Sequence, residues 1–179
     1  MARLILLDRD GVINFDSPDY IKTADEWRPI PGSLNAIAAL RANGFMVAVC
    51  TNQAGIARGK LGESDLAGIH AKMDAALGAL NTRLDGLTFC PHHPDDACEC
   101  RKPQPGMLLK MMRQLSASAR DTVFVGDSLK DLQAAHAAGC TGVLVRTGNG
   151  RKSEAAVTTQ GMVVRTFADL ASFVRDWVS

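Results

Sequence analysis

Short apolar runs alternate with longer amphipathic stretches along the chain. Four of these runs are rich in Val, Ile and Leu and end in small or polar residues, a pattern typical of strands that are buried on both faces. They predict strands at residues 4–7, 46–50, 122–125 and 142–145. Residues 87–90 predict a fifth strand, and residues 162–164 predict a sixth strand at an edge of the sheet.

The stretches between these runs carry apolar residues at helical spacing. They predict helices over residues 33–43, 64–80, 107–115, 129–138 and 167–178. Gly44 and Gly139 would end two of them, and Ser64 would cap the second. This alternation predicts an α/β fold: a doubly wound, mostly parallel sheet with helices on both faces, formed by residues 1–179 as one domain. In such sheets ligands bind beyond the carboxyl ends of the strands.

Composition limits the partners that such a domain could have. Hydrophobic residues make up 46% of the chain and charged residues 22%, with a formal net charge of +1. This balance is typical of a folded protein, and no overall field would attract nucleic acid or an anionic membrane. No apolar run reaches the roughly 18 residues of a membrane span, and Met1-Ala2-Arg3 does not resemble the start of a signal peptide. We therefore expect a cytoplasmic protein without nucleic-acid or membrane partners.

Polar residues follow the predicted strands at four places. Asp8-Arg9-Asp10-Gly11-Val12 follows the first strand, although an Asp-Gly pair alone is common in turns. Thr51-Asn52-Gln53 follows the second, and Arg101-Lys102-Pro103 precedes a helix. Gly126-Asp127-Ser128 follows the strand predicted at residues 122–125, with Asp131 shortly after it. Two acidic clusters at strand ends offer the oxygen ligands that Mg²⁺ prefers.

Taken together and in this order, the four motifs resemble those of the haloacid dehalogenase superfamily of phosphotransferases. The resemblance implies a Rossmann-like core, with Asp8 as the nucleophile and Asp10 as the general acid and base. Thr51 and Lys102 would stabilise the transferring phosphoryl group. Asp8, the backbone carbonyl of Asp10 and Asp127 would hold Mg²⁺. Asp131 would support Lys102 or the metal's surroundings, and an aspartate at position 10 favours the hydrolysis of phosphate esters.

A loop at residues 90–100 concentrates three cysteines and two histidines. In a reducing compartment such a cluster is more often a metal site than a set of disulfides, and a redox or incidental cluster is the alternative. Alternate spacing along both arms predicts a structural Zn²⁺ site, with His93 as the spare imidazole and these ligands: Cys90, His92, Cys98 and Cys100. Cys50 and Cys140 lie in apolar surroundings and are expected to act as small buried residues.

This loop, placed just before Arg101-Lys102-Pro103, resembles one group of the superfamily: the bacterial heptose bisphosphate phosphatases and the related histidinol-phosphatase domains. The resemblance implies a small sugar bisphosphate as substrate and a place in the synthesis of lipopolysaccharide heptose precursors. It implies substrate contacts from Asp16, Asp19, Tyr20, Asn52, Gln53, Ala54, Arg101 and Ser128. Ser128 stands where the family often has lysine. The role of Arg58 stays open.

The spacing between motifs leaves no room for an inserted cap domain. The site is therefore expected to be open and walled by loops, and the protein to be a monomer. Two alternatives stay open: a histidinol-phosphate phosphatase, and a zinc-stabilised binding module without catalysis. The anomer of the sugar 1-phosphate is not determined by the sequence.

Overall fold

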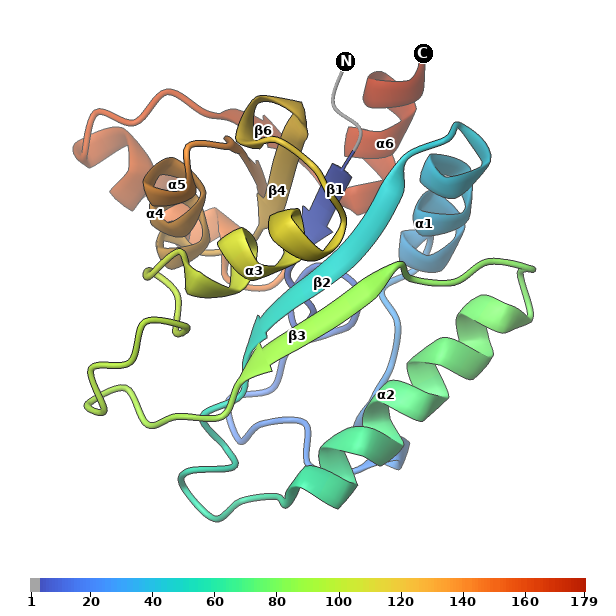
Figure 1. Ribbon diagram of the computed structural model, residues 1–179, viewed down its shortest axis with the longest axis vertical. Helices are drawn as coiled ribbons and strands as arrows, with labels where there is room; N and C mark the ends of the chain where they lie inside the picture. The colour runs from blue at the N-terminus through green and yellow to red at the C-terminus, as the bar shows by residue number, and fades with distance from the viewer. Residues whose placement is uncertain (1–3) are drawn as a thin grey trace.

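A single parallel sheet forms the centre of the molecule (Figure 1). The structure, a computed structural model, describes residues 4–179; Met1-Ala2-Arg3, on which part of the localisation prediction rests, lies outside them. The strand order is β3-β2-β1-β4-β5-β6. The strands are β1 (Leu4–Leu7), β2 (Met46–Asn52), β3 (Gly86–Cys90), β4 (Thr122–Gly126), β5 (Thr141–Val145) and β6 (Arg165–Phe167).

Helices cover both faces of this sheet. The core on one face includes residues of α1 (Ser33–Ala42), α2 (Glu63–Gly78) and α6 (Leu170–Val178). The other face packs against α3 (Gly106–Gln114), α4 (Leu129–Ala138) and α5 (Gly150–Thr159). Two 3₁₀ turns, η1 (Ala24–Glu26) and η2 (Ala119–Asp121), complete the elements. The predicted doubly wound α/β class is confirmed.

The central strand shows why a continuous apolar run is needed. Ile5 and Leu7 of β1 belong to the core on the α1 side, whereas Leu4 and Leu6 belong to the core on the α3 side. All four side chains are fully buried. Each contributes about 1.5–3 kcal/mol relative to an exposed side chain. A charged residue at Leu6 would therefore disrupt the sheet on which the functional residues are mounted.

The chain after β5 departs from the predicted pattern. The edge strand is Arg165–Phe167, because these residues pair with Val143–Val145 of β5; the prediction of residues 162–164 was wrong. Met162 and Val164 pack against a small apolar cluster while Val163 is fully exposed, which imitates the alternation of a strand. Helix α6 consequently begins only at Leu170, where the Asp169 carboxylate accepts the Ser172 backbone N–H.

One helix was missed, and one predicted helix cap needs correction. Helix α5 was not predicted, because the residues that it buries are Gly150, Ser153 and Val157, of which Val157 alone has a large apolar side chain. Helix α2 is capped by Gly62, whose backbone N–H donates to Asp65, so the prediction of Ser64 as the cap was wrong. Elsewhere the predicted helices stand within about two residues of the observed ones, as expected for helix ends.

The order of strands determines where a ligand site can lie. Chain connections run towards β2 and β3 on one side of β1 and towards β5 and β6 on the other side of β4. The carboxyl ends of β1 and β4 therefore meet at the switch point of the sheet. Within residues 4–179 only loops and η1 separate β1 from α1, and no inserted cap domain is present.

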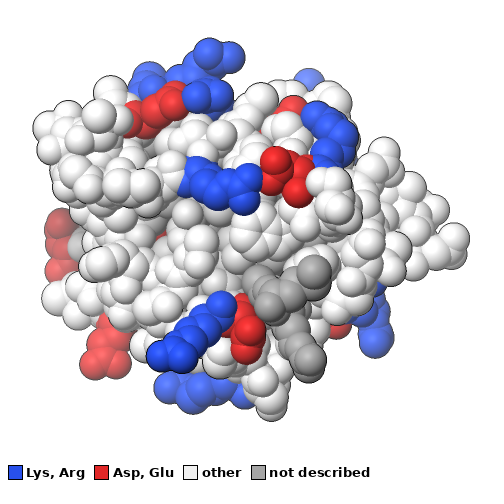
Figure 2. Space-filling model, turned by 90° about the horizontal axis from the view of Figure 1, so that it is seen from above, with Lys and Arg blue, Asp and Glu red and all other residues white. Residues whose placement is uncertain are grey.

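Two surface properties bear on partners. Among the described residues, no helix combines the length and apolar character that crossing a bilayer would need. Figure 2 shows the face at the amino ends of the strands, where basic and acidic side chains are interspersed over a largely uncharged surface. This face carries no field of one sign.

Candidate active site

A cavity of about 310 Å³ lies at the carboxyl ends of β1 and β4. Residues at or after the carboxyl ends of β1, β2, β3, β4 and β5 line it, as does the first turn of α4. The sequence motifs thus converge on one place. Its lining includes Asp8, Asp10, Thr51, Lys102, Asp127 and Asp131.

Lys102 is the central cation of this cavity. Its Nζ lies 2.9 Å from Asp8 Oδ1 and 2.7 Å from Asp131 Oδ1, and its side chain is 2% exposed. Burial alone would lower the pKa of Lys102, but the carboxylates of Asp131 and Asp8 raise it above its ordinary value. The lysine therefore stays charged beside Asp8.

Asp8 lies in a strongly acidic environment despite this lysine. Burial raises the pKa of Asp8 well above its ordinary value, Lys102 acts in the opposite direction, and Asp131, Asp127 and Asp10 raise the pKa further. The backbone N–H of Arg9 donates to Asp8 Oδ1 at 2.7 Å. These two donors fix the carboxylate at the end of β1.

Asp131 is held within the start of α4. Its Oδ2 accepts the Ser128 hydroxyl at 2.7 Å and the backbone N–H groups of Ser128 and Asp127 at 3.0 and 3.2 Å. Its Oδ1 faces Lys102. With both oxygens occupied in this way, Asp131 is placed to support Lys102.

Asp127 completes the acidic group. Its Oδ2 accepts the backbone N–H of Asn149 at 2.8 Å. Burial, followed by repulsion from Asp131, raises the pKa of Asp127 from 3.8 to about 7. Gly11, at a φ of 84°, passes so close to this carboxylate that a Cβ would collide with it. The glycine of the Asp-Gly pair is thus required by packing against Asp127.

These carboxylates fit a hard divalent cation. One oxygen from each of Asp8, Asp127 and Asp131 lies within 4.8 Å of the others. Among residues 4–179, Asp8 Oδ2 and Asp127 Oδ1 accept no hydrogen bond. Buried carboxylates that repel one another and retain free oxygens are the donor set that Mg²⁺ prefers.

Asp10 is held by four side-chain contacts. Arg9 donates from Nε and a terminal nitrogen at 3.0 and 3.1 Å, Asn14 Nδ2 at 2.8 Å and Gln53 Nε2 at 3.0 Å. The same Gln53 amide donates to Thr51 Oγ1 at 3.0 Å. The carboxylate of Asp10 is therefore fixed beside the hydroxyl of Thr51.

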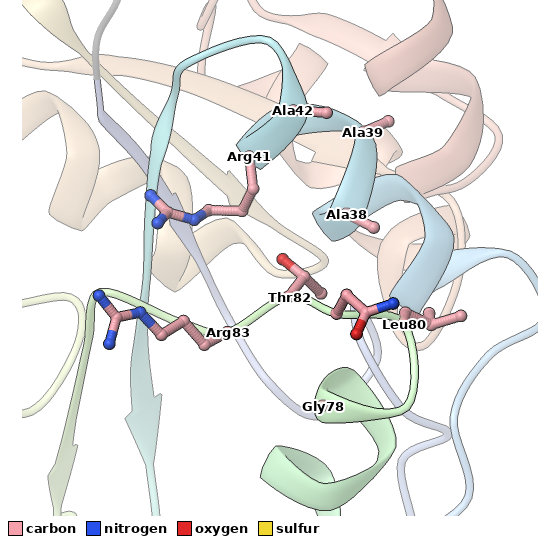
Figure 3. Close-up of a pocket in the computed structure, with 9 residues that line it drawn as sticks. Ala38, Ala39, Arg41, Ala42, Gly78, Leu80, Thr82 and Arg83 are labelled. Atoms are coloured by element: carbon pink, nitrogen blue, oxygen red, sulfur yellow. The ribbon is translucent and has the colours of Figure 1, made fainter.

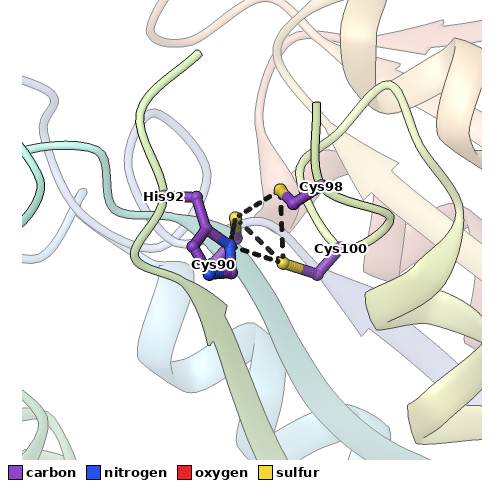
Figure 4. A group of neighbouring side chains, drawn as sticks. All are labelled: Cys90, His92, Cys98 and Cys100. Atoms are coloured by element: carbon purple, nitrogen blue, oxygen red, sulfur yellow. Dashed lines mark hydrogen bonds between the residues drawn. The ribbon is translucent and has the colours of Figure 1, made fainter. Parts of the chain in front are cut away.

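The cysteine loop forms a compact cluster next to this cavity (Figure 4). Cys90 Sγ lies 3.1 Å from Cys100 Sγ and 3.6 Å from Cys98 Sγ, and His92 Nδ1 lies 3.2 Å from Cys100 Sγ and 3.5 Å from Cys90 Sγ. A tetrahedral zinc with Zn–S of about 2.3 Å gives ligand separations of about 3.5–3.8 Å. The sulfur separations are too long for a disulfide, and the cysteines are free. The four residues fit zinc. His93 instead faces Asp95 and lies outside the cluster.

The position of Lys102 depends on this loop. Cys100 is followed directly by Arg101 and Lys102, and Asn52 holds the lysine backbone from β2. The Lys102 N–H donates to Asn52 Oδ1 at 3.0 Å, and Asn52 Nδ2 donates to the Lys102 carbonyl at 3.1 Å. The lysine backbone is thus held by the loop before it and by the end of a central strand.

Most of the residues expected to contact substrate line the cavity. Two do not: Asp19 has a side chain that is 67% exposed and pairs with Lys22 at 2.8 Å, and Ala54 is buried away from the lining. Arg58 is exposed and also lies outside the lining. The expected residues that do line it are Asp16, Tyr20, Asn52, Gln53, Arg101 and Ser128.

Sequence reasoning missed two functional residues that line the cavity and one that lies behind it. Lys130 and Asn149 both line it, and the fully buried Arg9 holds Asp10 from behind. Lys130 stands two positions after Ser128, on the first turn of α4. The absence of lysine at position 128 could have directed attention to it. No sequence signal marks Asn149, because its position depends on how the loop after β5 folds.

Comparison with known proteins agrees with this geometry. A family model described as haloacid dehalogenase (HAD)-hydrolase-like matches residues 99–170. The chain is 47% identical over 169 residues to the D-glycero-beta-D-manno-heptose-1,7-bisphosphate 7-phosphatase of Pseudomonas aeruginosa, covering 94% of each chain. It is 41% identical to the protein of that name from Escherichia coli, covering 96% of this chain and 93% of the relative.

Solved structures give the same result. The D,D-heptose 1,7-bisphosphate phosphatase of Bordetella bronchiseptica, complexed with magnesium and phosphate, superposes with a TM-score of 0.93 at 46% identity over 98% of both chains. The corresponding phosphatase of Burkholderia thailandensis gives a TM-score of 0.76 at 38% identity over 99% of both chains.

The fold and the cavity define a hydrolase with a strand-end aspartate pair. The chain belongs to the HAD-like hydrolases and, within them, to the family of the D-glycero-beta-D-manno-heptose-1,7-bisphosphate 7-phosphatases. The predicted superfamily and the prediction of a phosphoric monoester hydrolase are confirmed. The alternative of a non-catalytic zinc-stabilised module is not supported.

Proposed function

We propose that this protein removes the 7-phosphate of D-glycero-β-D-manno-heptose 1,7-bisphosphate in a Mg²⁺-dependent reaction. The observation that carries the proposal is the convergence of Asp8, Asp10 and Lys102 in one cavity of a chain that is 47% identical, over 94% of its length, to a relative named for this reaction. The β anomer is taken from the names of the relatives.

Two displacements at phosphorus would complete the reaction. A carboxylate oxygen of Asp8 attacks the 7-phosphorus, the bond to the C7 oxygen breaks, and Asp10 gives that oxygen a proton. The products are the sugar 1-phosphate with a free 7-hydroxyl and an aspartyl phosphate. Asp10 then takes a proton from water, the water oxygen attacks phosphorus, and phosphate leaves as the Asp8 carboxylate is restored.

Charge in both displacements would be stabilised by fixed groups. Lys102 is buried, charged and 2.9 Å from Asp8, and the Thr51 hydroxyl lies at the end of the neighbouring strand. Cations and donors held in place are the main source of catalysis in phosphoryl transfer. Asp8, the backbone carbonyl of Asp10 and Asp127 would hold Mg²⁺. When bound, the ion lowers the repulsion between the Asp8 carboxylate and the anionic phosphate.

The basic residues near Lys102 would bind the second phosphate. Arg101 and Lys130 line both the catalytic cavity and an adjoining hollow that reaches the cysteine loop. The Arg101 Nη1 is buried and has no hydrogen-bond partner among residues 4–179. A phosphate can accept two parallel hydrogen bonds from such a guanidinium. Asp16, Tyr20, Gln53, Asn52 and Ser128 would complete the contacts to the sugar.

The remaining assignments are proposed on the same basis. A structural Zn²⁺ would bind Cys90, His92, Cys98 and Cys100 and shape the backbone before Arg101. Residues 1–179 would act as one phosphatase domain, supported by their single sheet. We propose a cytoplasmic monomer that meets a small soluble substrate and needs no nucleic acid or membrane.

Phosphate release from three esters tests the proposal: both anomers of the heptose bisphosphate and histidinol phosphate, with and without Mg²⁺. We expect the highest kcat/KM with the β-bisphosphate, dependence on Mg²⁺, and ³¹P NMR signals for a retained 1-phosphate. Preference for histidinol phosphate, which lacks a second phosphate, or loss of the 1-phosphate would contradict the proposed substrate.

The variant Lys130→Ala tests the recognition of the second phosphate. We expect KM for the bisphosphate to rise about 10-fold, because a hydrogen bond to a charged group contributes about 1.5–3 kcal/mol. KM for a simple monophosphate ester should not change. An equal effect on both esters would assign Lys130 to the reacting phosphate instead.

A further inference from the structure

The guanidinium of Arg9 is fully buried and joins two side chains that no motif connects. Its Nε and one terminal nitrogen donate to the two oxygens of Asp10 at 3.0 and 3.1 Å. Its other terminal nitrogen, Nη1, lies 3.1 Å from Nε2 of His70. His70 comes from α2, on a segment far from Asp10 in the sequence.

The direction of the hydrogen bond to His70 follows from chemistry. A guanidinium has five N–H donors and no acceptor, and it stays protonated in proteins. His70 Nε2 must therefore accept, and the neutral ring carries its proton on Nδ1. Burial, together with the charge of Arg9, lowers the pKa of His70 to about 4, whereas Asp10 acts to raise it. The imidazole thus remains an acceptor at neutral pH.

We propose that His70 is a positioning residue that holds Arg9 in the orientation needed to aim the Asp10 carboxylate for proton transfer. The Asp10 side chain is 21% exposed and opens towards the cavity, so its orientation depends on its hydrogen bonds, of which Arg9 supplies two and Asn14 and Gln53 one each. Arg9 is anchored at Asp10 on one side and at His70 on the other, and the His70 ring packs near Phe89 of β3 with ring centroids 6.3 Å apart. The inference rests on the proposed function, in which Asp10 is the acid and base.

Because Asp10 donates a proton to the leaving group, a positioning role of His70 can be distinguished from a purely structural role by comparing two leaving groups. Proton donation matters for an alkyl leaving group such as a sugar oxygen and hardly at all for 2,4-dinitrophenolate. The value of kcat/KM reports the first displacement, in which the leaving group departs. A misaimed Asp10 therefore lowers kcat/KM for the sugar ester selectively.

Two variants separate the possibilities. His70→Leu keeps the volume but removes the acceptor, whereas His70→Gln offers an amide oxygen to Arg9. We expect His70→Leu to lower kcat/KM for the sugar bisphosphate about 10- to 100-fold, the usual cost of lost positioning, and to change kcat/KM for 2,4-dinitrophenyl phosphate less than about 3-fold. His70→Gln should restore most of the activity.

Equal losses on both esters, accompanied by a lower Tm, would assign His70 a structural role and overturn the inference, as would unchanged activity of His70→Leu. A wild-type chain that is inactive on both esters with Mg²⁺ would instead refute the proposed function.

If His70→Leu does not fold, ¹⁵N NMR of the wild-type imidazole tests the hydrogen bond from Arg9 to His70. We expect the Nδ1–H tautomer between pH 6 and 8, and an Nε2–H or charged ring would overturn the inference.

Discussion

Two hollows lie at opposite ends of the same sheet, and the larger one is lined by fewer residues that could take part in catalysis. The hollow near the amino ends of β2 and β3 has a volume of about 800 Å³, against about 310 Å³ for the cavity at the carboxyl ends of β1 and β4. Figure 3 shows the larger hollow, where small side chains of α1 face the turn after α2. Of its two arginines, Arg41 pairs with Asp85 at 2.5 Å and Arg83 is exposed.

The difference follows from chain direction. In a parallel sheet every strand delivers its next residues to the same end, and the following helices begin there with unpaired N–H groups. Asp8, Thr51 and Asp127 therefore meet, whereas the hollow at the opposite end is lined by the tail of α1, the end of α2 and the turn that follows it. Topology, not volume, locates the chemistry of this protein. If this explanation is right, substitutions at the carboxyl end of the sheet should affect activity far more than substitutions at the amino end.

Asp8→Asn should have the largest effect. Removing the proposed nucleophile should lower kcat by about 10⁴-fold or more, as in other enzymes with covalent intermediates. The matched control is Asp85→Asn, which removes a carboxylate at the amino-end hollow and should keep nearly full kcat. Phosphate release with Mg²⁺ measures both. Comparable losses in the two variants would remove the contrast between the hollows.

Cys98→Ser should have the next largest effect, mainly on stability. Loss of one proposed ligand should weaken zinc binding by about 100-fold, or about 2.7 kcal/mol, which would lower Tm by about 5–11 °C for a chain of this size. The control, Cys140→Ser, changes a thiol outside the cluster. Elemental analysis and thermal unfolding are the measurements. A Cys98→Ser chain with normal zinc content and Tm would contradict the ligand assignment.

The pH dependence of magnesium stabilisation should be smaller but has a definite sign. The folded pKa values of Asp8 and Asp127 are raised, that of Asp127 from 3.8 to about 7, so between these pH values the folded chain binds more protons than the unfolded chain. Stability without metal therefore falls as pH rises through this window. Mg²⁺ takes the place of the protons, and the increase in Tm that it causes should be larger at pH 8 than at pH 5.

Thermal unfolding with and without Mg²⁺ at the two pH values measures this effect, and Asp127→Asn is the control that should lose most of it. An increase in Tm that is equal at both pH values, or larger at pH 5, would show that the ion binds elsewhere.

Arg83→Ala should have the smallest effect. Arg83 is exposed at the amino-end hollow and forms no ion pair among residues 4–179. We expect kcat/KM and Tm to match the wild type, since substitutions of exposed side chains change stability by less than about 0.5 kcal/mol. The same phosphate-release assay measures the variant. A marked loss of activity would show that the larger hollow contributes to catalysis, contrary to this prediction.

The parts that sequence could predict are those determined by local pattern. Continuous apolar runs identify buried strands, and residues just after them must share one end of the sheet, so Asp8, Thr51 and Asp127 were predictable. Asn149 was not, because its approach depends on the turn after β5, and the one sequence hint to Lys130 is the absence of lysine at position 128. The burial of Arg9 was also hidden, because a charged residue between two aspartates is expected to be solvated until its partner His70 is known.

The Asp10→Asn variant should reveal the aspartyl phosphate that we propose on Asp8. With 2,4-dinitrophenyl phosphate the first displacement needs no acid, whereas release of phosphate from Asp8 needs the base that this variant lacks. Acid quenching followed by mass spectrometry of the peptides should show one phosphoryl group on the peptide that contains Asp8. A burst of dinitrophenolate without phosphorylated protein, or a phosphoryl group on another residue, would contradict the account.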